Sequence, residues 1–159
     1  MIEVAQGKPV LTNSAAYEAT PDRINDGNTN QRWAGGSCTH SDPSPRAGET
    51  HNWIRIDLGK TYDLTSVEVW DREDSCCRNR LNTLEIWAGN YPEKFDLNEK
   101  CNGPFPASIG STAEINCRRT GRYVFFTQKL PGALTICEAK VYANAIRDVP
   151  PARFAHSMA

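Results

Sequence analysis

The chain has 159 residues, which suits one domain of ordinary size with a substantial hydrophobic core. Its 18 basic and 19 acidic side chains leave a formal net charge of −1, so we expect no general attraction to nucleic acid or to acidic membranes. No run of 18 apolar residues occurs, and we expect no direct insertion into a bilayer.

Taken in chain order, the sequence patterns indicate β-strands and no long helix. Alternation of apolar and polar residues, or a short apolar run, marks five segments as strands. These segments are residues 52–58, 65–70, 83–87, 122–126 and 134–142. Several short strands separated by turns are typical of an all-β sandwich or barrel.

Glycine and proline mark the connections between the predicted strands. Turn signals lie at Gly27, Gly59, Pro104 and Gly132, and irregular loops are predicted over residues 39–51 and 91–111. We therefore expect the strand 52–58 to end at the turn around Gly59.

The two ends of the chain lie outside this pattern. Residues 1–4 have neither the basic region nor the apolar segment of a signal peptide, so we expect none in this sequence. The strand pattern stops after Asn144, and prolines follow soon afterwards. We therefore expect one domain over residues 1–145 and a linker-like tail over residues 146–159.

Six cysteines, an even number, indicate disulfide bonds and a secreted or extracellular protein. No C-x-x-C occurs and the three histidines are isolated, which leaves a four-ligand zinc site without support. The alternative is six free thiols in a cytosolic protein. The adjacent pair Cys76 and Cys77 argues against it, because neighbouring positions suit inert core thiols poorly.

A charged loop over residues 71–80 follows the predicted strand 65–70. It places three basic and three acidic side chains around Cys76 and Cys77. A disulfide between these neighbours would close a tight ring, brace the loop and offer a small apolar plate. A solvated charged turn is the alternative interpretation.

Two further segments could carry chemistry. Residues 35–40 contain two glycines, which let a backbone pass closely, and end at His40, which could also be an ordinary loop histidine. Residues 26–28 read Asp-Gly-Asn, and with Glu138 they offer oxygen ligands for a hard cation. Taken alone, Asp-Gly-Asn is also a common turn.

Together these segments resemble one family, the F-type lectins or fucolectins, over about residues 4–142. The family pattern has a histidine after Ser-Cys-Thr, a strand Trp-x-x-Val/Ile-Asp-Leu, a loop Arg-x-Asp-Cys-Cys-x-x-Arg and a late strand Cys-Glu-x-x-Val. The corresponding segments here are residues 37–40, 53–58, 72–80 and 137–141. The adjacent cysteines between arginines make this signal specific.

The resemblance implies a jelly-roll β-sandwich of the discoidin-like, galactose-binding-domain-like kind. It also implies three disulfides that leave no thiol unpaired: Cys38–Cys137, Cys76–Cys77 and Cys101–Cys117. In the chain-entropy model, the bridge that closes about a hundred residues contributes roughly 4–5 kcal/mol and the short Cys101–Cys117 loop about 3 kcal/mol.

The resemblance further implies a non-catalytic lectin that recognises terminal L-fucose on glycans. Its sugar-binding residues carry over to His40, Arg72 and Arg80, and the remaining members of the expected site are Tyr17, Trp33, Asp74, Cys76 and Cys77. Two guanidinium groups supply planar forks of donors for vicinal hydroxyls, and we expect His40 to donate to an axial hydroxyl. A single site of this kind binds weakly, so we expect avidity from several sites, for example in a homo-oligomer.

This sequence departs from the family pattern at two places. The loop between His40 and Arg72 is longer than is usual, and Ser75 interrupts Asp-Cys-Cys. Counted from Arg72, the second arginine would fall on Asn79, whereas counted from the cysteine pair it falls on Arg80. We take Arg80, because the disulfide ring fixes where the following loop points, and Arg78 is the fallback.

The cation implied by the resemblance is a structural calcium ion beneath the sugar-binding loops. Its ligands map to side chains of Asp26, Asn28, Ser37 and Glu138, with backbone carbonyls near Arg23 and Cys137. Its expected role is to fix loop geometry without contacting the sugar.

Three alternative functions are weighed against this prediction. A glycosidase would need a pair of carboxylates, which Asp71, Glu73 or Asp74 could offer, but neighbouring arginines should keep all three ionised. A discoidin-like module for phospholipid or protein ligands would expose apolar residues on its loops, and Trp33 is the one clear candidate. The chain could also be the carbohydrate-binding module of a larger toxin or glycosidase.

Overall fold

The computed structural model of the chain describes residues 1–42, 47–77, 80–105 and 111–144. These ranges contain eight β-strands and three short 3₁₀ turns, η1 (Pro21–Asn25), η2 (Trp33–Gly35) and η3 (Phe95–Leu97). In the same ranges no helix has the length and apolar character needed to cross a membrane. The predicted tail over residues 146–159 lies outside the described part of the chain.

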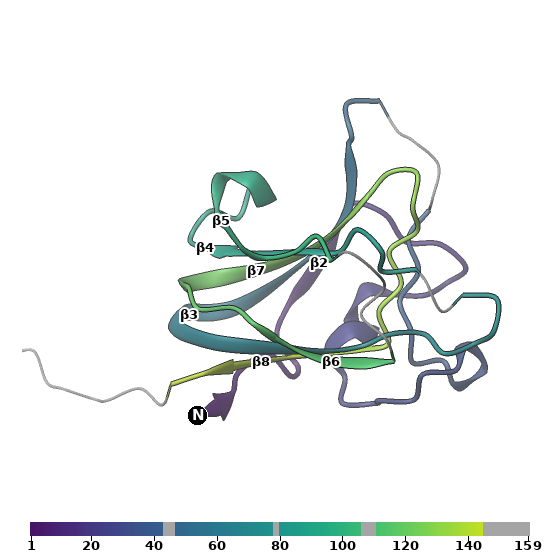
Figure 1. Cartoon of the computed structure of the whole chain (residues 1–159), viewed down its shortest axis with the longest axis horizontal. Coiled ribbons are helices and arrows are strands. Elements are labelled where there is room, and N and C mark those ends of the chain that lie inside the picture. The colour runs from purple at the N-terminus through teal and green to yellow at the C-terminus, as the bar shows by residue number, and fades with distance from the viewer. Residues whose placement is uncertain (43–46, 78–79, 106–110, 145–159) are drawn as a thin grey trace, which may run out of the picture.

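The strands form two antiparallel sheets that lie one above the other (Figure 1). The first sheet contains β1 (Ile2–Glu3), β8 (Glu138–Ala143), the second half of β3 (His51–Trp70) and β6 (Thr112–Asn116). The second sheet contains β2 (Val10–Thr12), the first half of β3, β7 (Thr120–Lys129), β4 (Glu85–Gly89) and β5 (Glu99–Asn102). The all-β sandwich predicted from the sequence is confirmed.

β3 is one continuous strand that belongs to both sheets, and the turn predicted at Gly59 is wrong. Asp57 pairs with Tyr123 of β7, and the register shifts before pairing resumes at Tyr62. Gly59 has φ +88°, a left-handed conformation that glycine adopts at low cost. The bulge and this glycine bend the strand so that it leaves one sheet and enters the other.

The hydrophobic core lies between the two sheets and follows the alternation seen in the sequence. In β3, Ile54, Ile56 and Leu58 are buried while the residues between them face outward. Side chains from the second half of β3 and from the other strands complete the core, among them Val67, Val69, Ile86, Val124, Phe126, Ile115, Val141 and Ala143. The apolar alternation therefore identifies the inner faces of both sheets correctly.

The last strand begins at Glu138, four residues later than predicted. Residues 134–136 pair instead with the loop before β3: Thr39 N–H donates to the Ile136 carbonyl (2.8 Å) and Ser41 N–H to the Leu134 carbonyl (3.1 Å). The Thr39 and Ser41 hydroxyl oxygens accept the backbone N–H groups of Ile136 and Leu134 in return. This irregular pairing holds His40, which lies between them, against the sandwich.

Three disulfides stabilise the fold, and they have the pairing implied by the family resemblance. Cys38–Cys137 joins the loop before β3 to the start of β8, and Cys101–Cys117 joins β5 to the end of β6. Cys76–Cys77 closes the tight ring between adjacent residues. No free cysteine remains in the described part of the chain.

Candidate functional site

Loops at one end of the sandwich form a pocket of about 260 Å³. Two of the loops lie between β2 and β3, and the third follows β3. The residues that line the pocket are Tyr17, Trp33, His40, Arg72, Cys76, Cys77 and Arg80. The structure thus brings together seven of the eight residues expected for sugar binding, and the eighth, Asp74, lies directly behind Arg72.

His40 and Arg80 form one hydrogen-bonded unit. His40 Nδ1–H donates to the Ser41 carbonyl (2.7 Å), which leaves Nε2 to accept from the Arg80 guanidinium (3.0 Å). Burial, together with the positive charges of Arg80 and Arg72, lowers the pKa of His40 and favours this neutral ring. In this arrangement neither ring nitrogen presents a donor to the pocket, contrary to the donor role expected for His40.

Arg72 is held from two sides. Its Nε–H donates to Asp74 Oδ2 (2.8 Å), and its guanidinium lies 4.9 Å from the centre of the Trp33 ring. Asp74 Oδ2 also accepts the backbone N–H of Trp33 (2.8 Å). The Arg72 hydrogen bond, and then the Trp33 N–H, lower the pKa of Asp74, so this carboxylate is ionised at neutral pH.

Arg80 has a different environment from Arg72. It forms no ion pair with any residue in the described ranges, and its second guanidinium nitrogen approaches Cys77 Sγ at 3.2 Å. Burial and the neighbouring Arg72 lower the pKa of Arg80, although a guanidinium remains charged at any physiological pH. Among the described residues, therefore, no carboxylate forms an ion pair with this positive group, although the charge of Asp71 still acts on it.

An aromatic wall stands beside the two guanidinium groups. The Tyr17 ring is 4.9 Å from His40 and 6.5 Å from Trp33, both in edge-to-face geometry. Tyr17 is 72% exposed, and both it and Glu18 have positive φ angles (55° and 59°) that non-glycine residues rarely adopt. The strained backbone places a large exposed ring at the rim of the pocket.

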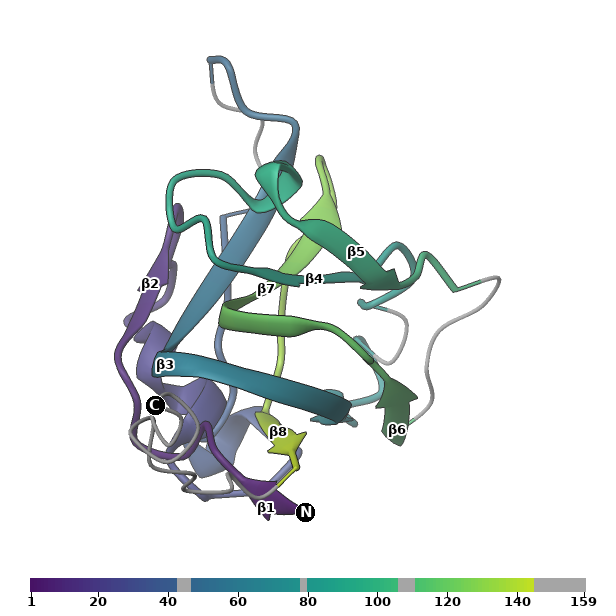
Figure 2. The same cartoon turned by 90° about the vertical axis from the view of Figure 1, so that its left-hand side faces the viewer.

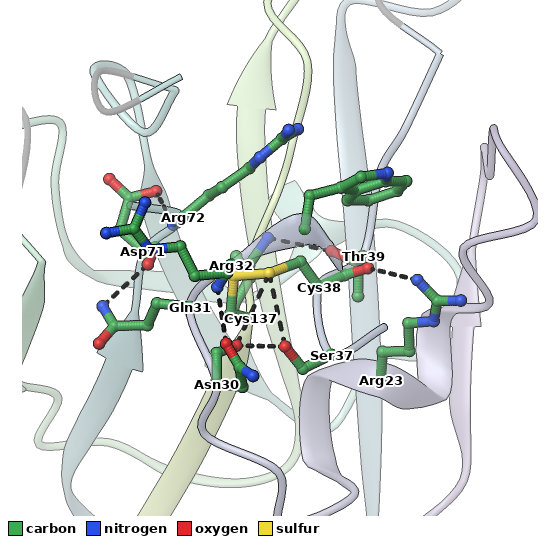
Figure 3. The surroundings of a disulfide bond; sticks show 12 residues. Arg23, Asn30, Gln31, Arg32, Ser37, Cys38, Thr39, Asp71, Arg72 and Cys137 are labelled. Atoms are coloured by element: carbon green, nitrogen blue, oxygen red, sulfur yellow. Dashed lines mark hydrogen bonds between the residues drawn. A yellow bond between two sulfur atoms is a disulfide. The ribbon is translucent and has the colours of Figure 1, made fainter. Parts of the chain in front are cut away.

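The loops around the pocket are tied together beneath it (Figure 3). The side-chain amide of Gln31 donates to the Asp71 backbone carbonyl (2.9 Å), and the backbone carbonyl of Gln31 accepts the Glu73 N–H (2.8 Å). These two hydrogen bonds join the η2 loop to the loop after β3. Arg23 donates to the Cys38 carbonyl (3.1 Å). The role of Gln31 could not be predicted from the sequence, because a single glutamine in a loop carries no recognisable signal. Arg78, the fallback for the second arginine, lies outside the described residues.

Glu138 is the most unusual of the residues expected to bind a cation. It is fully buried at the start of β8; Oε2 accepts the Gly27 N–H (2.9 Å), but Oε1 has no hydrogen-bond partner among the described residues. Burial, followed by the nearby Asp26 carboxylate, raises the pKa of Glu138 to about 8. A buried carboxylate with an unsatisfied oxygen beside a second acid fits the chemistry of a hard-cation site.

The other expected cation ligands lie in the same loops but have partners of their own. Asp26 Oδ1 accepts the Asn28 N–H (3.0 Å), and Asn28 Oδ1 accepts the Asn30 N–H (3.1 Å). Ser37 donates to the Asn30 carbonyl, next to the Cys38–Cys137 bridge (Figure 3). Within the described ranges no group of three or more His, Cys, Asp or Glu side chains gathers, so a cation here would depend on amide, hydroxyl and carbonyl oxygens as well.

The geometry gives little support to two of the three alternative functions, the glycosidase and the discoidin-like module. A glycosidase needs a proton-donating acid, whereas Asp74 has a lowered pKa and Asp71 accepts the Arg72 N–H (2.7 Å) from a fully buried position. Trp33 is the candidate exposed apolar residue of a membrane-binding module. It packs instead between Tyr17 and the Arg72 guanidinium.

Comparisons with known proteins agree on the class of domain. Residues 23–126 match the family described as NedA-like, galactose-binding domain. The lectin domain of lectinolysin, solved with Lewis B antigen, superposes with a TM-score of 0.76 at 26% identity and covers 91% of this chain and 99% of that one. A fucolectin from Morone saxatilis (striped bass) serum gives a TM-score of 0.77 at 27% identity over 92% of this chain and 48% of that one. The chain therefore has a galactose-binding-domain-like fold.

Sequence relatives define the family more narrowly. The fucolectin of Anguilla anguilla is 33% identical over 119 residues, which are 73% of this chain and 72% of that protein. The pentraxin fusion protein of Xenopus laevis is 30% identical over 146 residues, and there the match spans 33% of the relative. The chain belongs to the F-type lectin, or fucolectin, family, and it is a non-catalytic binding domain.

Proposed function

We propose that the loop-end pocket binds terminal L-fucose on glycans. The observation that carries this proposal is the convergence of Arg72, Arg80 and the Cys76–Cys77 disulfide in one pocket. A guanidinium has five N–H donors, and Arg80 has no ion-pair partner among the described residues, so donors remain for hydroxyl and ring oxygens.

The shape of the pocket suits a deoxy sugar. The disulfide ring and the aromatic wall of Tyr17 and Trp33 offer apolar surface for a methyl group and a C–H edge. Asp74 orients Arg72, and His40 orients Arg80, so both guanidinium groups are positioned before a ligand arrives. Relatives support the ligand class, because several are fucolectins and the lectin domain of lectinolysin has been solved with Lewis B antigen.

A single pocket of this kind gives modest affinity. Each hydrogen bond to a charged group contributes roughly 1.5–3 kcal/mol, but the loss of ligand and side-chain freedom offsets much of that gain. Strong attachment to a cell surface then requires several pockets, supplied by a homo-oligomer or by further domains. Three disulfides and the serum origin of a relative support a secreted, extracellular protein.

We also propose a structural calcium ion held by Asp26, Asn28, Ser37 and Glu138, with carbonyls near Arg23 and Cys137. The unsatisfied Glu138 Oε1 and its raised pKa support a cation there. A hard cation would neutralise the buried carboxylate and link the loop after η1 to β8. The sugar pocket lies on other residues, so the cation would act on loop geometry.

A glycan array with matched arginine variants tests the fucose proposal. Arg72→Ala should abolish binding to fucosylated glycans, and Arg72→Lys should weaken it strongly because the planar fork is lost while the charge remains. Arg118→Ala is the matched control, since this exposed arginine lies outside the pocket. Unchanged binding by Arg72→Ala, in a protein with wild-type thermal stability, would remove the proposal.

A further inference from the structure

A second pocket, of about 400 Å³, opens on the outer face of the second sheet and shares no residue with the loop-end pocket. Its walls come from β4, from the η3 turn and from the paired ends of β3 and β7, where His51 lies opposite Lys129. In Figure 2 the η3 turn and the start of β3 lie at the top of the view, and most of the purple and blue chain between β2 and β3 lies lower. The two pockets therefore occupy different parts of the molecule.

The apolar part of this second pocket is built on fixed rings. Phe95 lies 5.1 Å from Trp87 and 4.9 Å from His51, measured between ring centres. The indole N–H of Trp87 donates to Thr127 Oγ1 (3.1 Å), which sets the orientation of the ring. The aromatic surface is consequently preformed.

The polar part combines both signs of charge. Glu85 accepts a hydrogen bond from Lys100 (3.1 Å) and lies 3.7 Å from His51 Nε2. Within the described ranges, neither the Asp96 carboxylate nor the Lys129 ammonium group has a side-chain hydrogen bond or an ion pair. An uncommitted acceptor and an uncommitted donor thus stand beside the aromatic rings.

This mixture selects among classes of ligand. Burial lowers the pKa of His51, so the ring is neutral at pH 7 and two carboxylates balance two ammonium groups. An anion would face Glu85 and Asp96, a cation would face Lys129, and an apolar ligand would remove water from all three. A neutral polyhydroxylated ring offers an apolar C–H face for the aromatic rings and hydroxyls for both charge signs.

We propose that this outer-face pocket is a second saccharide-binding site that takes a neutral hexose. Its volume lies within the range of about 300–1,000 Å³ that is usual for small-molecule sites. The proposal does not depend on fucose binding at the loop-end pocket. With both pockets occupied, one chain holds two sugars at once and gains avidity without a second subunit.

Nuclear magnetic resonance of the tryptophan indole N–H groups tests this proposal. The chain has four tryptophans, and Trp87 reports on the outer-face pocket while Trp33 reports on the loop-end pocket. The Arg72→Ala variant, in which the loop-end pocket is disabled, is titrated separately with D-galactose, D-glucose and N-acetyl-D-glucosamine. A saturable shift of the Trp87 signal with at least one of these sugars is expected.

Two pocket variants and one control make the result specific. Asp96→Asn and Lys129→Met should each lower the affinity for the hexose that binds by about tenfold or more. Asp22 is an exposed acid outside both pockets, so Asp22→Asn should leave that affinity unchanged. Backbone amide spectra establish that each variant is folded. The proposal is overturned if none of the three hexoses shifts the Trp87 signal, or if neither pocket variant changes the affinity. A Trp33 shift with L-fucose in the wild-type protein reports on the loop-end pocket alone, so the two proposals fail separately.

Discussion

At the scale of single residues, His40 acts in this account as a positioning group for Arg80. Its Nδ1–H is fixed on the Ser41 carbonyl, so the other nitrogen can only accept, and Arg80 supplies the proton. The neutral ring is therefore the form that can accept the Arg80 hydrogen bond and hold the guanidinium in place for the proposed sugar. Protonation would place a second donor opposite Arg80 and add a third positive charge to the pocket.

This arrangement predicts the pH dependence of L-fucose affinity. Because burial and both arginines lower the pKa of His40 below 6.5, the ring stays neutral from alkaline pH down past 6.5 and charges only at lower pH. Affinity measured by isothermal titration calorimetry should be constant above pH 6.5 and fall below it. A midpoint above pH 6.5 would show that a different group, or a protonated His40, controls binding.

The sequence predicted the pocket residues better than it predicted their roles. The register counted from the cysteines places Arg80, and the structure has this residue in the pocket beside Arg72. The partners of His40 could not be predicted, because the Ser41 carbonyl and the Arg80 side chain approach it only through the folded paths of two loops. Gln31 went unnoticed for the same reason.

At the scale of elements, the bent strand β3 is what joins the two sheets. Gly59 lies at the bend with φ +88°, and a Cβ there would meet no neighbouring atom within 4 Å. A substitution at this position therefore tests backbone conformation without steric overlap from packing.

We expect Gly59→Ala to lower the free energy of unfolding by about 1–2 kcal/mol, which is the cost of the left-handed conformation for a residue with a Cβ. Gly59→Asn should lower the free energy of unfolding by less, because asparagine adopts this conformation more readily than alanine does. Urea unfolding monitored by fluorescence measures both. Equal stability of the alanine variant and the wild type would show that the bend does not require the left-handed conformation.

Alternation in the sequence predicted the central strands but not the short outer ones. Residues of β3, β4, β7 and β8 alternate or form an apolar run long enough to recognise. β1, with two residues, and β2, with three, are too short to show any period. β5 and β6 were also missed, because polar residues dominate them and pairing with β4 and β3 determines their conformation.

Glu138, the first residue of β8, allows the calcium proposal to be tested by stability alone. Its pKa of about 8 lies above the ordinary value of 4.5, so in calcium-free protein its ionisation destabilises the fold as the pH rises from 4.5 through about 8. Glu138→Gln removes that charge and keeps an acceptor for the Gly27 N–H.

In chelator at pH 8, Glu138→Gln should melt about 2–4 °C above the wild type, and added calcium should then stabilise the wild type but not the variant. Differential scanning calorimetry with and without calcium gives the melting temperatures of both proteins under both conditions. Equal calcium responses in the two proteins would contradict the proposed ligand set.

At the scale of the whole molecule, one disulfide joins the loops of the loop-end pocket to the sandwich. Cys38–Cys137 links positions separated by 99 residues, whereas Cys101–Cys117 closes a loop of 16. The longer loop loses more entropy in the unfolded chain when it is closed. Replacing Cys38 and Cys137 by alanine should therefore cost roughly 4–5 kcal/mol, against about 3 kcal/mol for Cys101 and Cys117.

Denaturant unfolding of the two double variants gives this comparison. The variant without Cys38–Cys137 should also bind L-fucose more weakly, since His40 lies two residues from the bridge. Similar stability losses in the two variants, with unchanged fucose affinity in both, would show that the long bridge neither stabilises the fold more nor positions the pocket.

A crystal structure of the protein with bound L-fucose would show directly where the sugar lies. We expect one fucose in the loop-end pocket, with its oxygens on the Arg72 and Arg80 guanidinium groups and an apolar edge against the Cys76–Cys77 disulfide. Fucose bound elsewhere, or a pocket in which the two arginines point away from the sugar, would contradict this expectation.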